Sequence, residues 1–181
     1  MPQKHGPWTI QEKSLKYQDS FITVSEDQVI RPDGQPAMYA TVAMKPGVAV
    51  LPIHSNDEVY LTKQFRYALG KESIEVVCGA IEEDEPPLTA AQREVQEEVG
   101  IKAEEWVDLG LFDIDTSIVH CSVHMFLAKQ LTFIKANQEG TETIETVCVP
   151  FKEAVRMVMD SIITHSPSCV LILKARNILT D

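Results

Sequence analysis

The stretch of residues 79–101 constrains this chain more than any other part of the sequence. It contains seven carboxylates and a single cation, Arg93. Two consecutive prolines suit the opening of a helix, where their missing N–H groups would have no partner, and Gly100 suits the left-handed residue just past a helix end. The pattern therefore predicts a helix over about Pro87–Val99.

This predicted helix has two opposed faces. Apolar residues share one arc, which predicts that this face packs in the core: Leu88, Ala91, Val95 and Val99. Glu94, Glu97 and Glu98 fall roughly opposite, although like charges at this spacing destabilise a helix by about 0.2–0.5 kcal/mol per pair. A divalent cation would reverse that repulsion, and oxygen donors without Cys or His favour Mg²⁺ or Mn²⁺ over zinc.

An acidic helix face is more often simply solvated, so the spacing of the surrounding residues decides between the two interpretations. Five residues separate Gly79 from Glu85, and seven more precede the run Arg93–Ile101, which reads REVQEEVGI. This spacing matches the 23-residue Nudix box at each defined position. The chain therefore resembles the Nudix hydrolases, which cleave nucleoside diphosphates linked to another group.

Segments outside the box narrow the resemblance. The chain is similar to the ADP-ribose and ADP-sugar pyrophosphatases in these places: Trp8, Arg31–Gly34, Gly47–Pro52, Leu61–Tyr67 and Glu75–Gly79. This implies a nucleotide-derived small molecule as the substrate. The chain departs from the family at Asp84, where a second glycine often precedes the box glutamate, and at Thr116, where the residues that mark particular substrates are absent.

The resemblance also implies a metal site. Glu94 and Glu98 would be the principal ligands of Mg²⁺, with Mn²⁺ as a substitute, and Glu97 would share or bridge the metal ions. The backbone carbonyl of Cys78 would complete the ligand shell. Because such ions neutralise a pyrophosphate and orient the attacking water, Glu97 and Glu98 are expected to be catalytic.

Four residues receive further roles from the resemblance. Arg93 would form an ion pair with Glu85, and this catalytic pair would orient the carboxylates. Arg66 would bind the substrate, although a surface arginine paired to a nearby acid is an equal alternative. Glu75 would reach the substrate or a water held by the metal, or would simply flank the sheet.

The sequence leaves the general base open. Cys121 stands where the ADP-ribose enzymes often carry a loop glutamate that helps to activate water, and no glutamate occurs from residue 106 to residue 138. The remaining candidates are Glu97, His120, Glu139 and Glu142. A histidine near its ordinary pKa of about 6.5 suits this role near neutral pH, although a loop histidine is more often structural.

Composition excludes several classes of partner. The formal net charge of −11 argues against nucleic-acid polymers and acidic membrane surfaces. The four cysteines are widely separated and form no CxxC pair, which predicts reduced thiols rather than a zinc site or a disulfide framework. The N-terminus lacks an apolar signal segment, and no apolar run reaches about 18 residues, so we expect a cytoplasmic protein.

The expected fold class is α/β, a Nudix α/β/α sandwich with a mixed central sheet and an N-terminal antiparallel β layer. Residues 1–46 would form that layer and join two subunits into a homodimer, and residues 47–181 would form the Nudix domain. Apolar patterns predict the elements. Strands are expected at Phe21–Val24, Gln28–Arg31, Met38–Ala43, Val48–Ile53, Val59–Phe65, Trp106–Ile114, Ser122–Leu131 and Ile144–Val149, and helices at Phe151–Ile162 and Ser168–Leu179.

These observations predict Mg²⁺-dependent hydrolysis of a pyrophosphate bond. The substrate would be a nucleoside diphosphate derivative of the ADP-ribose or nucleotide-sugar type, and the products a nucleoside monophosphate and a sugar phosphate. One alternative keeps the chemistry and changes the substrate to a free or damaged nucleoside triphosphate or a dinucleotide. The other is a nucleotide-sensing module that no longer hydrolyses.

Overall fold

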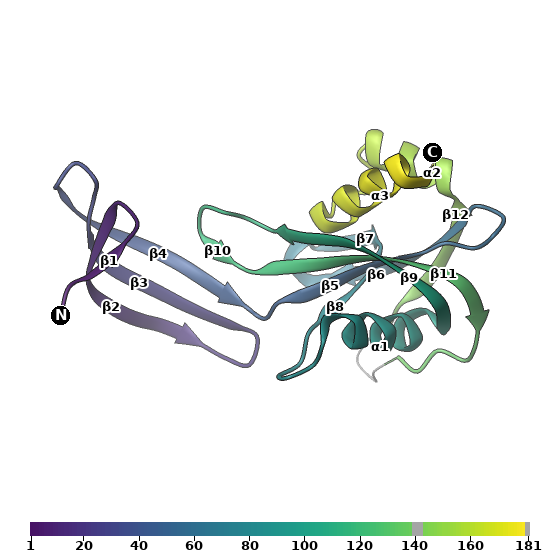
Figure 1. The fold of residues 1–181 in the computed structure, drawn as a ribbon, viewed down its shortest axis with the longest axis horizontal. Helices are drawn as coiled ribbons and strands as arrows, with labels where there is room; N and C mark the ends of the chain where they lie inside the picture. The colour runs from purple at the N-terminus through teal and green to yellow at the C-terminus, as the bar shows by residue number, and fades with distance from the viewer. Residues whose placement is uncertain (139–142, 180–181) are drawn as a thin grey trace. The chain divides into compact units, whose positions relative to one another are not determined.

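The computed structural model describes residues 1–138 and 143–179, which form two compact units (Figure 1). Unit 1 consists of Met1–Lys45 together with Asp113–Cys121. Unit 2 consists of Pro46–Phe112 and Ser122–Asp181. Glu139 and Glu142, two of the predicted base candidates, lie outside the described residues.

Unit 1 is built on a five-stranded sheet with the strand order β1-β2-β3-β4-β10. Strands β1 to β4 pair antiparallel with their neighbours, and β10 pairs in parallel with β4. The sheet contains the antiparallel pairing that the fold-class prediction gave to this part of the chain. Its strands are β1 (Gln3–His5), β2 (Trp8–Gln18), β3 (Ile22–Ile30), β4 (Pro36–Met44) and β10 (Val119–His120).

Two details of unit 1 differ from the sequence prediction. The runs predicted as two short strands belong to one strand, β3, because its polar middle pairs with β4 as regularly as its ends do. The strand β2 was not predicted, since its polar and apolar residues alternate weakly. The predicted turn between β3 and β4 is confirmed: the Gly34 N–H donates to the Arg31 carbonyl at 2.9 Å, and Gly34 has φ +83°.

Unit 2 contains two sheets. The first has the order β8-β5-β11-β9, and it is mixed because β5 pairs antiparallel with β8 and parallel with β11. The second has the order β12-β6-β7 and is antiparallel. The strands are β5 (Gly47–Pro52), β6 (Glu58–Arg66), β7 (Lys71–Glu75), β8 (Val77–Ala80), β9 (Ile101–Asp113), β11 (Ser122–Phe133) and β12 (Glu145–Pro150), with a 3-10 turn η1 at Tyr67–Leu69.

Helices cover unit 2 on two sides, as an α/β/α sandwich requires. Helix α1 (Pro87–Val99) lies on one side of the four-stranded sheet, and α2 (Phe151–Met159) and α3 (Ser166–Leu179) lie on the other (Figure 1). Helix α2 ends before the predicted Ile162, because Ser161 turns the chain with φ +57°. No helix in residues 1–138 and 143–179 is long and apolar enough to span a membrane.

A hydrophobic core of unit 2 lies between α1 and the four-stranded sheet. Ala91 and Val95 are fully buried there and Val99 is 8% exposed, which confirms the predicted apolar face. Leu88 is 40% exposed, so its assignment to the core was wrong, because the buried part of the helix begins only at Ala90. Full burial of a valine side chain stabilises a fold by about 1.5–3 kcal/mol.

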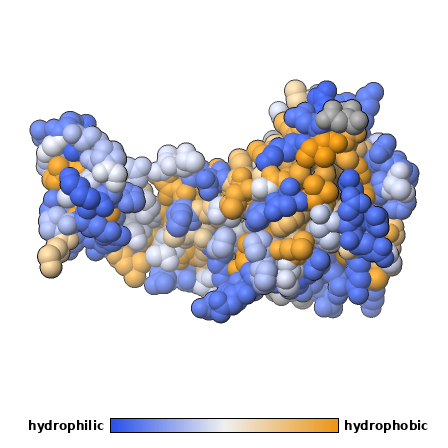
Figure 2. Space-filling view, in the orientation of Figure 1, coloured by the Kyte–Doolittle hydropathy of each residue, from blue (hydrophilic) through white to orange (hydrophobic). Residues whose placement is uncertain are grey.

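The predicted central strand and the last helix both pack as expected. The four residues Val48–Leu51 of β5 are at most 1% exposed, as a strand covered on both faces should be. Helix α3 buries Leu171, Ile172 and Ala175, and hydrophobic residues also show on its outer surface in the space-filling view (Figure 2).

Candidate functional site

The predicted helix α1 has the expected ends. Pro87 is its first residue, and Gly100 follows its last residue with φ +64°. The Gly100 N–H donates to the Gln96 carbonyl at 3.2 Å, which closes the last turn. A Cβ on Gly100 would lie 2.5 Å from the Ile134 carbonyl oxygen, so the close approach of that loop also requires glycine.

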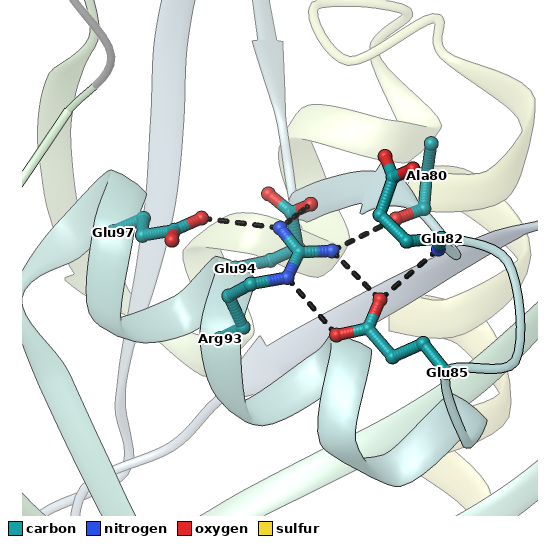
Figure 3. Close-up of polar contacts among 6 residues, drawn as sticks. All are labelled: Ala80, Glu82, Glu85, Arg93, Glu94 and Glu97. Atoms are coloured by element: carbon teal, nitrogen blue, oxygen red, sulfur yellow. Dashed lines mark hydrogen bonds and ion pairs between the residues drawn. The ribbon is translucent and has the colours of Figure 1, made fainter.

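Arg93 is the centre of a polar network on this helix (Figure 3). Its Nε and Nη2 donate to the two carboxylate oxygens of Glu85, each at 3.0 Å, and Nη2 also donates to the Ala80 carbonyl at 3.0 Å. Its Nη1 donates to Glu94 at 2.6 Å and to Glu97 at 3.1 Å. One guanidinium therefore joins the strand end at Ala80, the loop glutamate and two carboxylates of the helix face.

Glu85 also closes the loop that precedes the helix. Its Oε2 accepts the Glu82 N–H at 3.1 Å, and its own N–H donates to the Glu82 carbonyl at 3.1 Å. Asp84 has φ +61°, which explains why the family often has glycine here and why aspartate, one of the residues that tolerates this region, can replace it. The substitution at Asp84 thus leaves the loop closed.

The Arg93 network shifts the pKa values of both Glu85 and Arg93. Hydrogen bonds from Arg93 lower the pKa of Glu85, burial opposes that shift, and the Glu82 N–H adds to it. The hydrogen bonds to Glu85 raise the pKa of Arg93 despite partial burial, with Glu94 and Glu97 contributing in the same direction. Glu85 is therefore held as a carboxylate and Arg93 as a cation.

Gly79 allows the acidic helix face to approach β8 closely. A Cβ built on Gly79 would overlap the carboxylate of Glu94, so any other residue at this position would displace that carboxylate. Burial raises the pKa of the neighbouring Cys78 thiol, and the negative charges of Glu98, Glu75 and Glu94 raise it further. The charges of three carboxylates therefore act on the part of β8 that contains Cys78 and Gly79.

Arg66 and Glu75 form the second arginine–glutamate pair of unit 2. Nε and Nη2 of Arg66 donate to the two oxygens of Glu75 at 3.0 and 2.6 Å, and Glu75 is only 1% exposed. The hydrogen bonds that Arg66 donates to Glu75 raise the pKa of Arg66, while burial lowers it and the charges of Glu75 and Glu98 raise it further. The two predicted substrate residues therefore contact each other and lie within the field of the helix carboxylates.

The donor set on α1 fits a hard divalent cation, because all of its side-chain donors are carboxylate oxygens. Glu98 is 4% exposed, and the side chain of Glu94 is 13% exposed. Within the described part of the chain, however, no group of three or more His, Cys, Asp or Glu side chains is gathered as a metal site. In this arrangement Arg93 provides the positive charge between Glu94 and Glu97.

Of the candidates for the general base that the structure describes, His120 belongs to unit 1 and Glu97 lies on α1. His120 is exposed and lines a groove of about 910 Å³ whose walls also include Trp8 and Tyr39. Cys121, at the position of the family's loop glutamate, donates its thiol to the Lys45 carbonyl at 3.2 Å. The side chain of Glu97 is 29% exposed and stays hydrogen-bonded to Arg93.

Sequence reasoning missed His165, which contacts Glu75 of the predicted substrate pair, and Ser168, which contacts His165. His165 lies 3.4 Å from Glu75, and Ser168, which is fully buried, lies 2.9 Å from the same imidazole. The only sequence signal was a serine in an otherwise apolar helix. Such a residue is common enough that it predicts no site by itself.

Comparisons with known proteins agree with this geometry. The NUDIX domain family matches residues 43–165. An ADP-ribose pyrophosphatase of Bacillus subtilis (strain 168) is 27% identical over 156 residues, which are 83% of this chain and 84% of that protein. A methanol dehydrogenase activator of Bacillus methanolicus is 26% identical over 169 residues, which are 90% of this chain and 91% of that protein.

A solved structure shares the fold over nearly the whole chain. It is described as "Crystal structure of ADP compounds hydrolase" and superposes with a TM-score of 0.84 at 19% identity. The match covers 98% of this chain and 97% of that chain. The fold of this chain is therefore one that an experimentally determined protein adopts.

The lowered pKa of Glu85 predicts a specific loss of stability in acid. A carboxylate whose pKa is lower in the folded than in the unfolded protein stabilises the fold above its ordinary pKa of 4.5, and that stabilisation disappears as the pH falls through the folded value. Glu85→Gln should therefore be less stable than the wild type at pH 7 and lose less stability between about pH 5 and 3.

Urea unfolding at a series of pH values measures this difference. Glu83→Gln, which changes an exposed carboxylate of the same loop, is the matched control and should follow the wild-type curve. Parallel curves for the wild type and Glu85→Gln across the acid range would contradict the prediction.

Proposed function

The chain belongs to the Nudix family, and from that premise we propose that this hydrolase cleaves the pyrophosphate bond of an ADP-ribose-like or nucleotide-sugar substrate. The products would be a nucleoside monophosphate and a sugar phosphate. The observation that carries the proposal is the Arg93 network, which holds Glu85, Glu94 and Glu97 together beside β8. The likeness to an ADP-ribose pyrophosphatase of Bacillus subtilis supports the choice of substrate.

Mg²⁺, with Mn²⁺ as a substitute, is the cofactor that this donor set favours. Glu94, Glu97 and Glu98 would hold it, together with the backbone carbonyl of Cys78. When bound, the cation would offset the charge of the pyrophosphate and make water a better nucleophile. Gly79 supports this assignment because it allows the Glu94 carboxylate to lie directly against β8.

The residues of the chain itself would bind and orient the substrate. Arg66, fixed by its two hydrogen bonds to Glu75, would place a cation against a phosphate oxygen. Arg93 would act indirectly by holding Glu94 and Glu97 in position. Glu97 remains a candidate for the base because its side chain is partly exposed on the acidic face.

Two other functions are candidates, and a substrate panel would give a different result for each of them. Hydrolysis of nucleoside triphosphates or dinucleotides is one candidate, and Thr116 selects between the substrates in neither direction, since the position lacks the residues that mark particular substrates. A nucleotide-sensing module without turnover is favoured by the likeness to a protein described as an activator. Both remain secondary to the proposed reaction, because the network around the box is complete in this chain.

A substrate panel tests the proposal directly. ADP-ribose, an ADP-sugar, ATP, a damaged nucleoside triphosphate and a diadenosine polyphosphate would each be incubated with Mg²⁺ or with a chelator, and the products separated by chromatography. We expect Mg²⁺-dependent conversion of ADP-ribose to AMP and ribose 5-phosphate. Glu98→Gln should lower kcat by about 10²–10³, as loss of a transition-state charge contact does.

The controls separate the candidates. Glu83→Gln changes an exposed carboxylate outside the network and should keep the wild-type rate. Preferred cleavage of ATP or of the dinucleotide would select the second candidate. Absence of metal-dependent turnover on every compound would overturn the hydrolytic proposal and favour the sensing module.

We also propose that the protein is a cytoplasmic homodimer joined through unit 1. This unit exposes several large apolar side chains that a second copy would bury: Leu15, Tyr17, Phe21, Met38, Met44 and Ile118. Phe21 is 68% exposed, so Phe21→Glu should weaken association without disturbing a packed core. Sedimentation velocity should give a dimer for the wild type and a larger monomer fraction for the variant; a wild-type monomer at micromolar concentration would contradict the proposal.

A further inference from the structure

We propose that His165 is a positioning residue for the reaction proposed above: together with Ser168, it fixes the buried Glu75 that aims Arg66 at the substrate. This inference rests on the proposed function for its substrate. It concerns the segment immediately before α3, which lies far along the sequence from the Nudix box and outside every motif found in it.

Glu75 is the residue through which His165 would act. It ends β7, is 1% exposed, and gives both carboxylate oxygens to Arg66. Burial raises the pKa of Glu75, but hydrogen bonds from Arg66 and Ser73 and the charge of Arg66 lower it by more, so the group is ionised at neutral pH. A buried carboxylate of this kind requires several donors to stay in place.

His165 lies directly against this carboxylate. Its Nδ1 is 3.4 Å from Oε2 of Glu75 and 2.9 Å from Oγ of Ser168. The hydrogen bond of this nitrogen is with Ser168, and the tautomer of the ring decides which of the two atoms donates. Oγ of Ser168 also accepts the Val76 N–H at 2.9 Å. The start of α3 is thereby tied to the chain between β7 and β8.

The same contacts set the orientation of Arg66. Oε2 of Glu75 accepts a hydrogen bond from Nη2 of Arg66 at 2.6 Å and also lies 3.4 Å from Nδ1 of His165. The Arg66 side chain is 37% exposed, and its Nη1 donates to no described residue, so one nitrogen of the guanidinium is available to an anionic ligand. A shift of Glu75 would turn the guanidinium and misplace that nitrogen.

The ionised groups that face His165 are Glu75 of β7 and Arg66 of β6, with the Ser168 hydroxyl on α3. Burial lowers the pKa of His165, the charge of Glu75 raises it, and the charge of Arg66 lowers it, with a net decrease from the ordinary value. The ring is therefore neutral at pH 7. A neutral ring lies against Glu75 without adding a second full charge that would compete with Arg66 for the carboxylate.

A purely structural role would have a different signature. The His165 carbonyl accepts the Cys169 N–H at 3.0 Å, so the residue also opens α3. If that were its whole contribution, substitution would lower the melting temperature and leave substrate binding unchanged. Kinetic parameters therefore distinguish a positioning role from a purely structural one. The comparison requires variants whose side chains place their polar atoms at different positions.

Two amides provide this matched comparison. The amide of His165→Asn occupies the region of Nδ1, whereas the amide of His165→Gln occupies the region of Nε2, away from Glu75. We expect His165→Gln to raise KM for ADP-ribose about tenfold with kcat changed less than about threefold, and His165→Asn to keep most of the wild-type affinity. His124→Asn, which alters another half-buried histidine paired to a carboxylate, should leave KM unchanged.

A double-mutant cycle tests whether His165 acts through Arg66. In the Arg66→Ala background, His165→Gln should have no further effect on KM, because the nitrogen that it positions is gone. Any one of three results would overturn the proposal. The effects of the two substitutions on KM could multiply, the Asn and Gln variants could have equal affinities, or His165→Gln could leave KM unchanged. Melting curves confirm that every variant is folded at the assay temperature.

A second measurement needs no turnover. The pKa of the His165 ring, followed by NMR, should rise in Arg66→Ala, since a cation that disfavours the charged ring is removed. An unchanged pKa would overturn the coupling whatever the kinetics show. If the wild type failed to cleave ADP-ribose while this pKa still rose, the proposed function would fall and the His165–Arg66 coupling would stand.

Discussion

The guanidinium of Arg93 is the interaction on which the catalytic half of this structure depends. Helix α1 places three glutamates on one face, an arrangement that repulsion alone would disfavour. Arg93 offsets that repulsion by binding Glu94 and Glu97 with one nitrogen while its other two bind Glu85. Only a planar cation with several donors can make these contacts at once, so lysine would not replace it.

The network also explains the sequence around the helix. Glu85 fastens the loop before α1, and the Ala80 carbonyl joins Arg93 to the end of β8. Gly79 leaves the space that the Glu94 carboxylate fills. A second pair joins Arg66 at the end of β6 to Glu75 at the end of β7. Partly buried arginine–glutamate contacts therefore involve residues that precede β8 and residues that follow it.

Local sequence patterns predicted much of this arrangement. The features that they did not predict depend on pairings between segments that are distant in the sequence. The ends of α1 follow from residues close together in sequence, and the contact of Arg93 with Glu85 was predicted from the resemblance to the family. Leu88 was misplaced because helical periodicity identifies a face and not where packing begins along it. The pairing of β10 with β4 and the contact of His165 with Glu75 join residues about 75 or more positions apart, and no local pattern encodes such a contact.

Amide hydrogen exchange in Arg93→Lys tests the central claim most directly. The Glu82 N–H donates to Glu85, which Arg93 holds in place, whereas the Gly100 N–H closes α1 at its far end. We predict that exchange at Glu82 accelerates at least about tenfold in the variant while exchange at Gly100 stays at the wild-type rate, since the loop is released and the helix is kept. Unchanged protection of Glu82 would contradict the account, because it would show that the loop closes without the guanidinium.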